Sequence, residues 1–123
     1  MTPAAEPSAS RLLFEPRCDL VVPIAVEVFR RDGEAVLEYA TNLSPGGVCL
    51  HARVRLTLGE SVTVAFELPG EDGRIRARGR VTWCEDDDPE AEACFLETGV
   101  RFEVVDEIDR ERITRFVRES EHE

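Results

Sequence analysis

A repeated alternation of apolar and polar residues constrains the fold more than any other feature of the sequence. In the clearest run, Val62, Val64 and Phe66 alternate with small or polar residues. A period of two places successive side chains on opposite faces of a β-strand. Segments rich in Gly, Pro, Asp and Ser interrupt the alternation at intervals of roughly 8–12 residues. The chain is therefore predicted to consist mainly of short antiparallel strands joined by turns.

Six strands are predicted from this alternation. Asp32-Gly33 is a typical hairpin turn between the first two, and Pro69–Gly73 separates the fourth from the fifth. A glycine-containing loop over residues 44–47 precedes the third strand. The predicted strands cover residues 21–29, 35–39, 48–52, 61–68, 74–84 and 94–102.

Beyond the sixth strand, the spacing of apolar residues changes to that of an α-helix. Ile108, Ile113, Phe116 and Val117 are predicted to share one stripe, and Asp106 is a suitable N-cap. Six short strands followed by one helix indicate a mostly β protein. We expect a six-stranded antiparallel barrel with a C-terminal α-helix packed on it.

A single domain is expected from a chain of 123 residues. Residues 1–14, rich in Ala, Pro and Ser, are predicted to be a flexible lead-in, residues 15–118 the domain, and residues 119–123 a charged tail. Large apolar side chains on the inward faces of the strands should form one core. The predicted core includes Ile24, Val26, Val64, Phe66, Trp83 and Phe102.

The charge of the chain is acidic and unevenly distributed. Its 15 basic and 26 acidic residues give a formal net charge of −11. Because duplex binding depends on cations that neutralise phosphates, this balance argues against general nucleic-acid binding. The first two-thirds of the chain are close to neutral, however, so that part could hold a small anionic ligand.

The residues that would support catalysis or metal binding are sparse. His51 and His122 lie far apart, and no pair of cysteines has the spacing of a redox or zinc motif. We therefore expect no enzymatic activity, no metal and no cofactor. The chain has no apolar run of the roughly 20 residues that cross a bilayer and no secretory signal, so a cytoplasmic location is expected. Reduced, mostly buried thiols are predicted for Cys18, Cys49, Cys84 and Cys94.

Three segments carry a family resemblance. The segment Thr41–Val48 reads TNLSPGGV and contains the pattern Asn42-x-Ser44-x-x-Gly47, residues 79–83 read GRVTW, and residues 99–102 read GVRF ahead of the helix. These segments resemble, in order, the motifs of the PilZ domain family, bacterial receptors for the second messenger cyclic di-GMP. The resemblance covers residues 15–118. It implies a PilZ-like barrel that acts in signalling for motility, pili or exopolysaccharide.

The loop that matches the family's (D/N)xSxxG signature can be interpreted in two ways. An Asn42 amide, a Ser44 hydroxyl and glycine N–H groups can bind a phosphate or a purine edge. Gly46 and Gly47 would then supply positive φ angles and a close approach of the ligand. Alternatively, Asn42 and Ser44 only cap their own turn. The resemblance favours the ligand-binding interpretation.

The resemblance also implies an RxxxR pair in the arm before the first strand, and this pair is missing. Residues 11–20 read RLLFEPRCDL, and the two expected positions fall on or near Glu15 and Asp19. Only Arg17 and Arg11 could replace the missing cations, and they are six positions apart instead of four. Arginines suit this role because their planar guanidinium groups bind phosphates in a bidentate manner.

Two functions remain open. Loss of two charge-assisted phosphate contacts, with carboxylates in their place, lowers affinity by about three decades. The first hypothesis is a signalling adaptor that acts through protein–protein interaction, with cyclic di-GMP binding weak or lost. The alternative is a working cyclic di-GMP receptor. Its candidate ligand residues are Arg11, Arg17, Asn42, Ser44, Gly46 and Gly47.

Two charged segments stand outside these motifs. Arg74, Arg76, Arg78 and Arg80 are predicted to line one face of the fifth strand. They could hold a phosphate or an acidic partner, or they could be a solvated face balanced by acids on neighbouring strands. The acidic loop at 85–92 is predicted to be a solubilising loop, because consecutive side chains do not converge on a cation.

Overall fold

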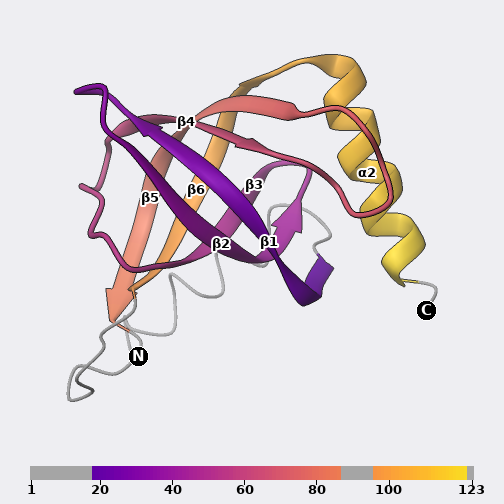
Figure 1. Ribbon diagram of the computed structural model, residues 1–123, viewed down its shortest axis with the longest axis horizontal. Coiled ribbons are helices and arrows are strands. Elements are labelled where there is room, and N and C mark those ends of the chain that lie inside the picture. The colour runs from indigo at the N-terminus through magenta and orange to yellow at the C-terminus, as the bar shows by residue number, and fades with distance from the viewer. Residues whose placement is uncertain (1–17, 87–95, 122–123) are drawn as a thin grey trace, which may run out of the picture.

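The computed structural model describes residues 18–86 and 96–121. Six antiparallel strands form a closed barrel in the order β1-β2-β3-β6-β5-β4, and helix α2 lies beside it (Figure 1). The predicted mostly β class, six-stranded barrel and C-terminal helix are therefore confirmed. The elements are β1 (Cys18–Arg30), β2 (Ala35–Ser44), β3 (Gly47–Ala52), β4 (Ser61–Phe66), β5 (Ile75–Asp86), β6 (Leu96–Val105) and α2 (Glu107–Glu121).

The β1–β2 hairpin turn forms as its sequence predicts. Gly33 adopts a φ of 95°, which favours glycine, and its N–H donates to the Arg30 carbonyl at 3.0 Å. The Asp32 carboxylate accepts a hydrogen bond of 2.9 Å from the Glu34 N–H. Residues 45–46 alone separate β2 from β3, so the predicted loop is a tight turn.

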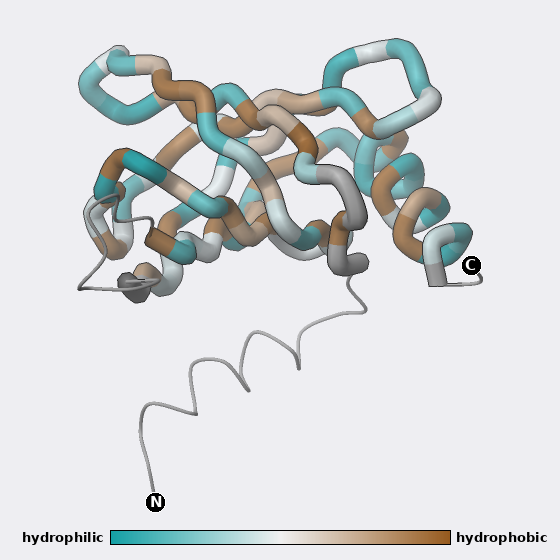
Figure 2. Tube along the Cα trace, turned by 60° about the horizontal axis from the view of Figure 1, so that its bottom comes forward, coloured by the Kyte–Doolittle hydropathy of each residue, from teal (hydrophilic) through white to brown (hydrophobic). Residues whose placement is uncertain are grey.

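The core fills the interior of the barrel. In β4, Val62, Val64 and Phe66 point inward, and none is more than 3% exposed. Figure 2 shows the same alternation of apolar and hydrophilic residues along the strands. Five of the six predicted core side chains belong to the buried cluster: Ile24, Val26, Val64, Phe66 and Phe102.

Trp83 is the exception, and the prediction that it joins the core is wrong. The side chain is half-buried and lies outside the core cluster. The register of β5 against β6 shifts between Val81, which pairs with Val100, and Trp83, which pairs with Gly99. This irregularity changes which face of the sheet the following residues occupy. Trp83 therefore lies against Gly99, where a Cβ atom would collide with the indole ring.

Helix α2 begins as predicted but buries a narrower stripe. The Asp106 carboxylate caps the helix by accepting a hydrogen bond of 2.9 Å from the Ile108 N–H. The Ile108 side chain is 69% exposed, so its predicted place on the apolar stripe is wrong. Ile113 and Val117 are buried in the core, and Phe116 packs against it.

Arg112 fastens α2 to the turn between β4 and β5. Its guanidinium donates to the Glu71 carboxylate at 3.1 Å and to the Asp109 carboxylate at 3.0 Å. It also donates to the carbonyls of Asp72 and Gly73. The hydrogen bond to Glu71 is the main reason why the pKa of Arg112 is raised. Apolar contacts and the multidentate Arg112 thus both hold the helix against the barrel.

The predicted domain limits and thiols are only partly within the described residues. Helix α2 continues through residues 119–121 of the predicted charged tail, and the predicted lead-in at 1–14 lies outside the described residues. Cys49 is buried and Cys84 is half-buried, and no disulfide joins these two cysteines. Cys94 and the side chain of Cys18 lie outside the description.

Replacing Phe66 by Ala should lower the free energy of unfolding by about 3–5 kcal/mol, because it removes a buried aromatic side chain and leaves a cavity. Urea denaturation of the full chain measures this loss. Leu58→Ala is the matched control: its side chain is 62% exposed, and its removal should change stability by no more than about 0.5 kcal/mol. A loss below about 1 kcal/mol for Phe66→Ala would contradict this core.

Candidate functional site

The candidate ligand loop is the β2–β3 turn, and its hydroxyl is engaged within the turn. Ser44 Oγ accepts a hydrogen bond from the Gly46 N–H at 3.2 Å and donates to the Gly47 carbonyl at 3.4 Å. The predicted positive φ at Gly46 and Gly47 is wrong. The described glycines with positive φ are Gly33, Gly59, Gly70 and Gly73.

Gly47 is required by the packing of the barrel. It pairs with Arg101 across the β3–β6 ladder. A Cβ atom at Gly47 would lie 2.5 Å from the Val100 carbonyl oxygen, closer than such atoms can approach. The packing of β3 against β6 therefore explains the glycine of the (D/N)xSxxG pattern without any ligand.

Two hydrogen bonds fix the turn to the rest of the molecule. The Gly46 carbonyl accepts from the Phe102 N–H of β6 at 2.8 Å. The Pro45 carbonyl accepts from Arg110 Nη1 of α2 at 2.9 Å. The turn is thus held in one conformation by a strand and a helix.

Asn42 differs from Ser44 because its amide forms no hydrogen bond within the described residues. Its side chain is half-buried on β2. In the ladder, Asn42 pairs with Cys49 of β3 on one side and with Asp19 of β1 on the other. The amide can therefore serve a ligand at this place, and the backbone of residue 19 lies directly beside it.

The residues predicted to supply the positive charges of the site lie outside the part of the chain that the structure describes. Arg11, Glu15 and Arg17 lie outside the described residues, as does the side chain of Asp19. The structure therefore brings together Asn42, Ser44, Gly46 and Gly47 of the predicted site residues, in one turn. It leaves the positions of Arg11 and Arg17 as predictions.

The three motif segments meet at one place in the barrel. Gly47 pairs with Arg101, Gly79 pairs with Phe102, and Trp83 pairs with Gly99. All three pairings involve β6. The segments that carry the resemblance therefore form the packing of β6 against its two neighbours, in addition to the candidate loop.

One polar cluster beside the loop could not be predicted from the sequence. His51 Nδ1 lies 2.8 Å from Glu97 Oε2, and the Cys49 thiol donates to Glu97 Oε1 at 3.5 Å. Glu97 lies 46 positions from His51 and 48 from Cys49 in the sequence, and only the β3–β6 register joins it to them. Within the described ranges, no group of three His, Cys, Asp or Glu side chains could hold a metal ion.

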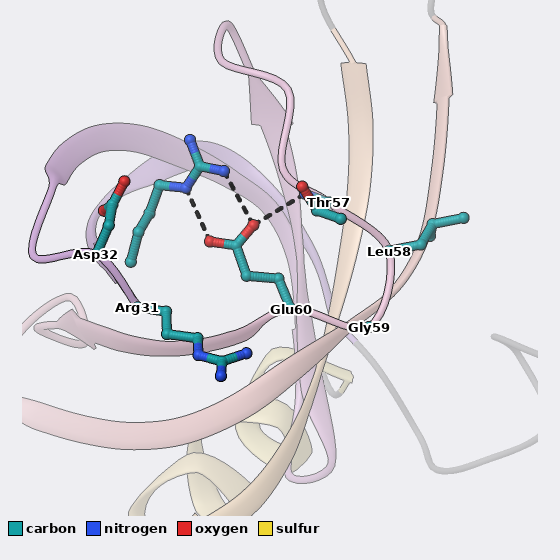
Figure 3. A pocket seen from close by; sticks show the side chains of 7 residues that line it. Arg31, Asp32, Thr57, Leu58, Gly59 and Glu60 are labelled. Atoms are coloured by element: carbon teal, nitrogen blue, oxygen red, sulfur yellow. Dashed lines mark hydrogen bonds and ion pairs between the residues drawn. The ribbon is translucent and has the colours of Figure 1, made fainter.

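A shallow depression of about 370 Å³ lies near the β1–β2 turn (Figure 3). Arg30 there forms a forked ion pair with Glu60, with distances of 2.8 Å and 3.0 Å. The Thr57 N–H donates to the same carboxylate at 3.0 Å. The hydrogen bond from Arg30 is the main reason why the pKa of Glu60 is lowered. Arg30, Glu60 and Thr57 thus bond to one another, and we interpret this cluster as one that stabilises the fold.

Arg76, Arg78 and Arg80 of the predicted row lie on the outer face of β5, and Arg74 directly precedes this strand. Arg74 forms an ion pair with Glu27 of β1, and Arg80 Nε lies 3.1 Å from a carboxylate oxygen of Glu103 of β6. Arg76 and Arg78 have no ion pair within the part of the chain that the structure describes. Acids on neighbouring strands therefore balance only part of this row.

None of the described helices is long and apolar enough to cross a membrane. A sequence comparison with protein families matches the PilZ domain over residues 14–119. No match was found among curated protein sequences.

Several solved structures share this fold. The PilZ domain of YcgR from Escherichia coli, solved with c-di-GMP, has a TM-score of 0.70 and 16% identity over 90% of this chain and 92% of that one. The motility inhibitor MotI of Bacillus subtilis has a TM-score of 0.73 and 18% identity over 89% of this chain and 51% of that one. MrkH of K. pneumonia has a TM-score of 0.74 and 15% identity over 86% and 48%. The chain thus spans about half the length of MotI and MrkH.

Replacing Gly47 by Ala should lower the free energy of unfolding by about 1–3 kcal/mol, because β3 and β6 must separate to admit the Cβ atom. Asn42→Ala is the comparison within the same motif. It should change stability by no more than about 0.5 kcal/mol, because the amide has no partner in the described structure. Chemical denaturation of both variants measures these changes in the free energy of unfolding. A Gly47→Ala variant as stable as the wild type would contradict the role of Gly47 in packing.

The Arg30–Glu60 pair should make stability depend on pH. Because the folded pKa of Glu60 is lowered, its contribution is fully present above the unfolded pKa of about 4.3 and is lost as pH falls through the folded pKa. Glu60→Gln should therefore show a smaller loss of stability on acidification than the wild type. Denaturation curves recorded from neutral to acidic pH measure this difference. If stability falls equally with pH in the variant and the wild type, the Arg30–Glu60 pair does not cause the pH dependence.

Proposed function

The chain belongs to the PilZ domain family, and from this premise we propose that it is a non-catalytic signalling adaptor in a bacterial cyclic di-GMP-related pathway. Such a pathway controls motility, pili or exopolysaccharide. The adaptor acts by binding another protein, and it binds cyclic di-GMP weakly or not at all. The fold shared with MotI, described as an inhibitor of motility, supports a signalling role.

The observation that carries this proposal is the β1–β2 register beside the candidate loop. The register pairs residue 19 with Asn42. Directly opposed residues of antiparallel strands have Cβ atoms about 4.5–5.5 Å apart. An arginine at position 19 would thus stand next to the amide that could bind the ligand. This chain has an aspartate there.

The size of the electrostatic effect supports weak binding. Each charge-assisted hydrogen bond to a phosphate contributes roughly 1.5–3 kcal/mol. A carboxylate in its place adds repulsion on the order of 1 kcal/mol near a surface. With Glu15 and Asp19 at both positions, affinity falls by about three decades. A receptor of micromolar affinity would then no longer bind at micromolar ligand concentrations.

A second candidate function is a cyclic di-GMP receptor in which Arg11 or Arg17 supplies the clamp. The observation that favours it is the Asn42 amide, which has no partner within the described residues. The long hydrogen bonds of Ser44 Oγ, at 3.2 Å and 3.4 Å, can also be exchanged for contacts to a ligand. Asn42 and Ser44 could therefore supply hydrogen bonds to the ligand under either proposal.

We expect the wild-type protein to bind cyclic di-GMP more weakly than about 100 μM, which corresponds to about −5.5 kcal/mol. Isothermal titration calorimetry measures this affinity. The fluorescence of Trp83, the single tryptophan, gives a second readout. Binding at low micromolar concentration would overturn the proposal in favour of the receptor, with Arg17→Ala as the next variant.

The double variant Glu15→Arg/Asp19→Arg tests the cause of the weak binding. It should bind cyclic di-GMP much more tightly than the wild type, and the gain should shrink as salt is added. Adding Asn42→Ala or Ser44→Ala to this variant should remove part of the gain. A double variant that binds no better than the wild type would show that residues 15 and 19 do not face the phosphates.

A further inference from the structure

A mixed basic and apolar surface crosses the barrel on the side of β5. The ladders place Phe29 of β1, Thr63 of β4, Arg78 of β5 and Val104 of β6 in one line. Arg76 and Arg80 flank Arg78 on the same face of β5. We call the surface formed by Phe29, Arg76, Arg78, Arg80 and Val104 the β5 face.

The cations of the β5 face are only partly compensated. Arg78 has no ion pair within the described residues, and it lies between Thr63 and Val104 in the ladders. Arg76 has its guanidinium carbon 5.6 Å from the centre of the Phe29 ring, a cation–π contact that leaves its charge unneutralised. Arg80 is compensated, because it pairs with Glu103 and donates to the Gly59 carbonyl at 2.8 Å.

The β5 face also exposes apolar area between these charges. Val104 is 53% exposed and lies near the end of the β5–β6 ladder, where it pairs with Arg78. Phe29 is half-buried under Arg76. A cationic row with apolar side chains beside it is complementary to a segment that alternates acidic and apolar residues.

We propose that the β5 face docks an acidic, apolar-containing segment of a partner protein. Carboxylates of the partner would pair with Arg76 and Arg78, and an apolar side chain would cover Val104. This inference rests on the proposed adaptor function, to which it adds the docking surface and the chemistry of the partner.

Charge and size favour a protein segment over a nucleic acid as the occupant. The whole chain carries a net charge of −11, which repels a polyanion along its length. A short acidic segment meets only the local field, because charges are screened beyond about 8 Å at physiological salt. The exposed Val104 side chain offers a phosphate backbone nothing to bind.

The β5 face is separate from the candidate ligand loop. In the closed order β1-β2-β3-β6-β5-β4, strands β2 and β5 occupy opposite positions. Asn42 lies on β2, whereas Arg76 and Arg78 lie on β5. Variants on one surface can therefore be tested without altering the other.

The probe is a fluorescein-labelled peptide of alternating Glu and Val, compared with a peptide that has Gln in place of Glu. Fluorescence anisotropy with the full chain at low salt should show binding of the Glu peptide only, weakening as salt is added. Chemical-shift changes in the labelled protein should centre on Arg76, Arg78 and Val104. Arg76→Gln/Arg78→Gln should weaken binding about tenfold.

Arg115→Gln/Arg118→Gln is the matched control, because it removes the same charge from exposed positions of α2. It should leave peptide affinity unchanged. The reversed variant Arg76→Glu/Arg78→Glu should instead bind a peptide of alternating Lys and Val. An equal loss in the α2 control, or no binding of the Glu peptide at low salt, would overturn the docking proposal. So would equally tight binding of a single-stranded oligonucleotide to this face, which would assign it to nucleic acid.

Titration of the same variants with cyclic di-GMP distinguishes the failure of this inference from that of the adaptor proposal. Arg76→Gln/Arg78→Gln should leave that titration unchanged. Tight cyclic di-GMP binding by the wild type would overturn the adaptor proposal and leave the peptide result intact. Absence of peptide binding would overturn the β5 face and leave the adaptor with a different surface.

Discussion

The close packing of β6 between β3 and β5 is the contact on which the rest of this barrel depends. A Cβ atom at Gly47 would strike the Val100 carbonyl, one at Gly79 would strike the Arg101 carbonyl, and one at Gly99 would strike Trp83. The three strands can approach one another only because these positions lack side chains. Since β6 joins the β2–β3 hairpin to the β4–β5 hairpin, this packing closes the barrel and positions the β2–β3 turn.

This packing also explains why the family resemblance says more about fold than about ligand. The three motif segments meet at β6, and Gly47 serves the packing whether or not a ligand is bound. The residues proposed to bind the ligand are a different set, the Asn42 amide and the charges of the arm. In this chain the arm contains no RxxxR pair, and the two expected positions fall on or near Glu15 and Asp19. A chain can therefore keep the barrel of a receptor while its affinity for the messenger changes independently.

The distribution of charge divides the molecule into surfaces with different possible roles. Two ion-pair clamps, Arg30 with Glu60 and Arg112 with Glu71, are internal to the fold. Arg76 and Arg78 have no such partner among the described residues, so their charge is available to another molecule. Because β2 and β5 are opposite in the barrel order, messenger binding and partner docking could use separate faces. An adaptor needs this separation if both surfaces are to be occupied at the same time.

The sequence alone determined the strands, the turns and most of the core, because the alternation of side chains and the chemistry of turns are local properties. It predicted the inward positions of Val64 and Phe66 and the cap at Asp106, all of which the structure shows. Tertiary structure determined the strand registers and the contacts between distant segments. The shift between Val81 and Trp83 moved the tryptophan out of the core, and the β3–β6 register joined His51 to Glu97. Such register and cross-strand contacts depend on distant segments, so no local pattern encodes them.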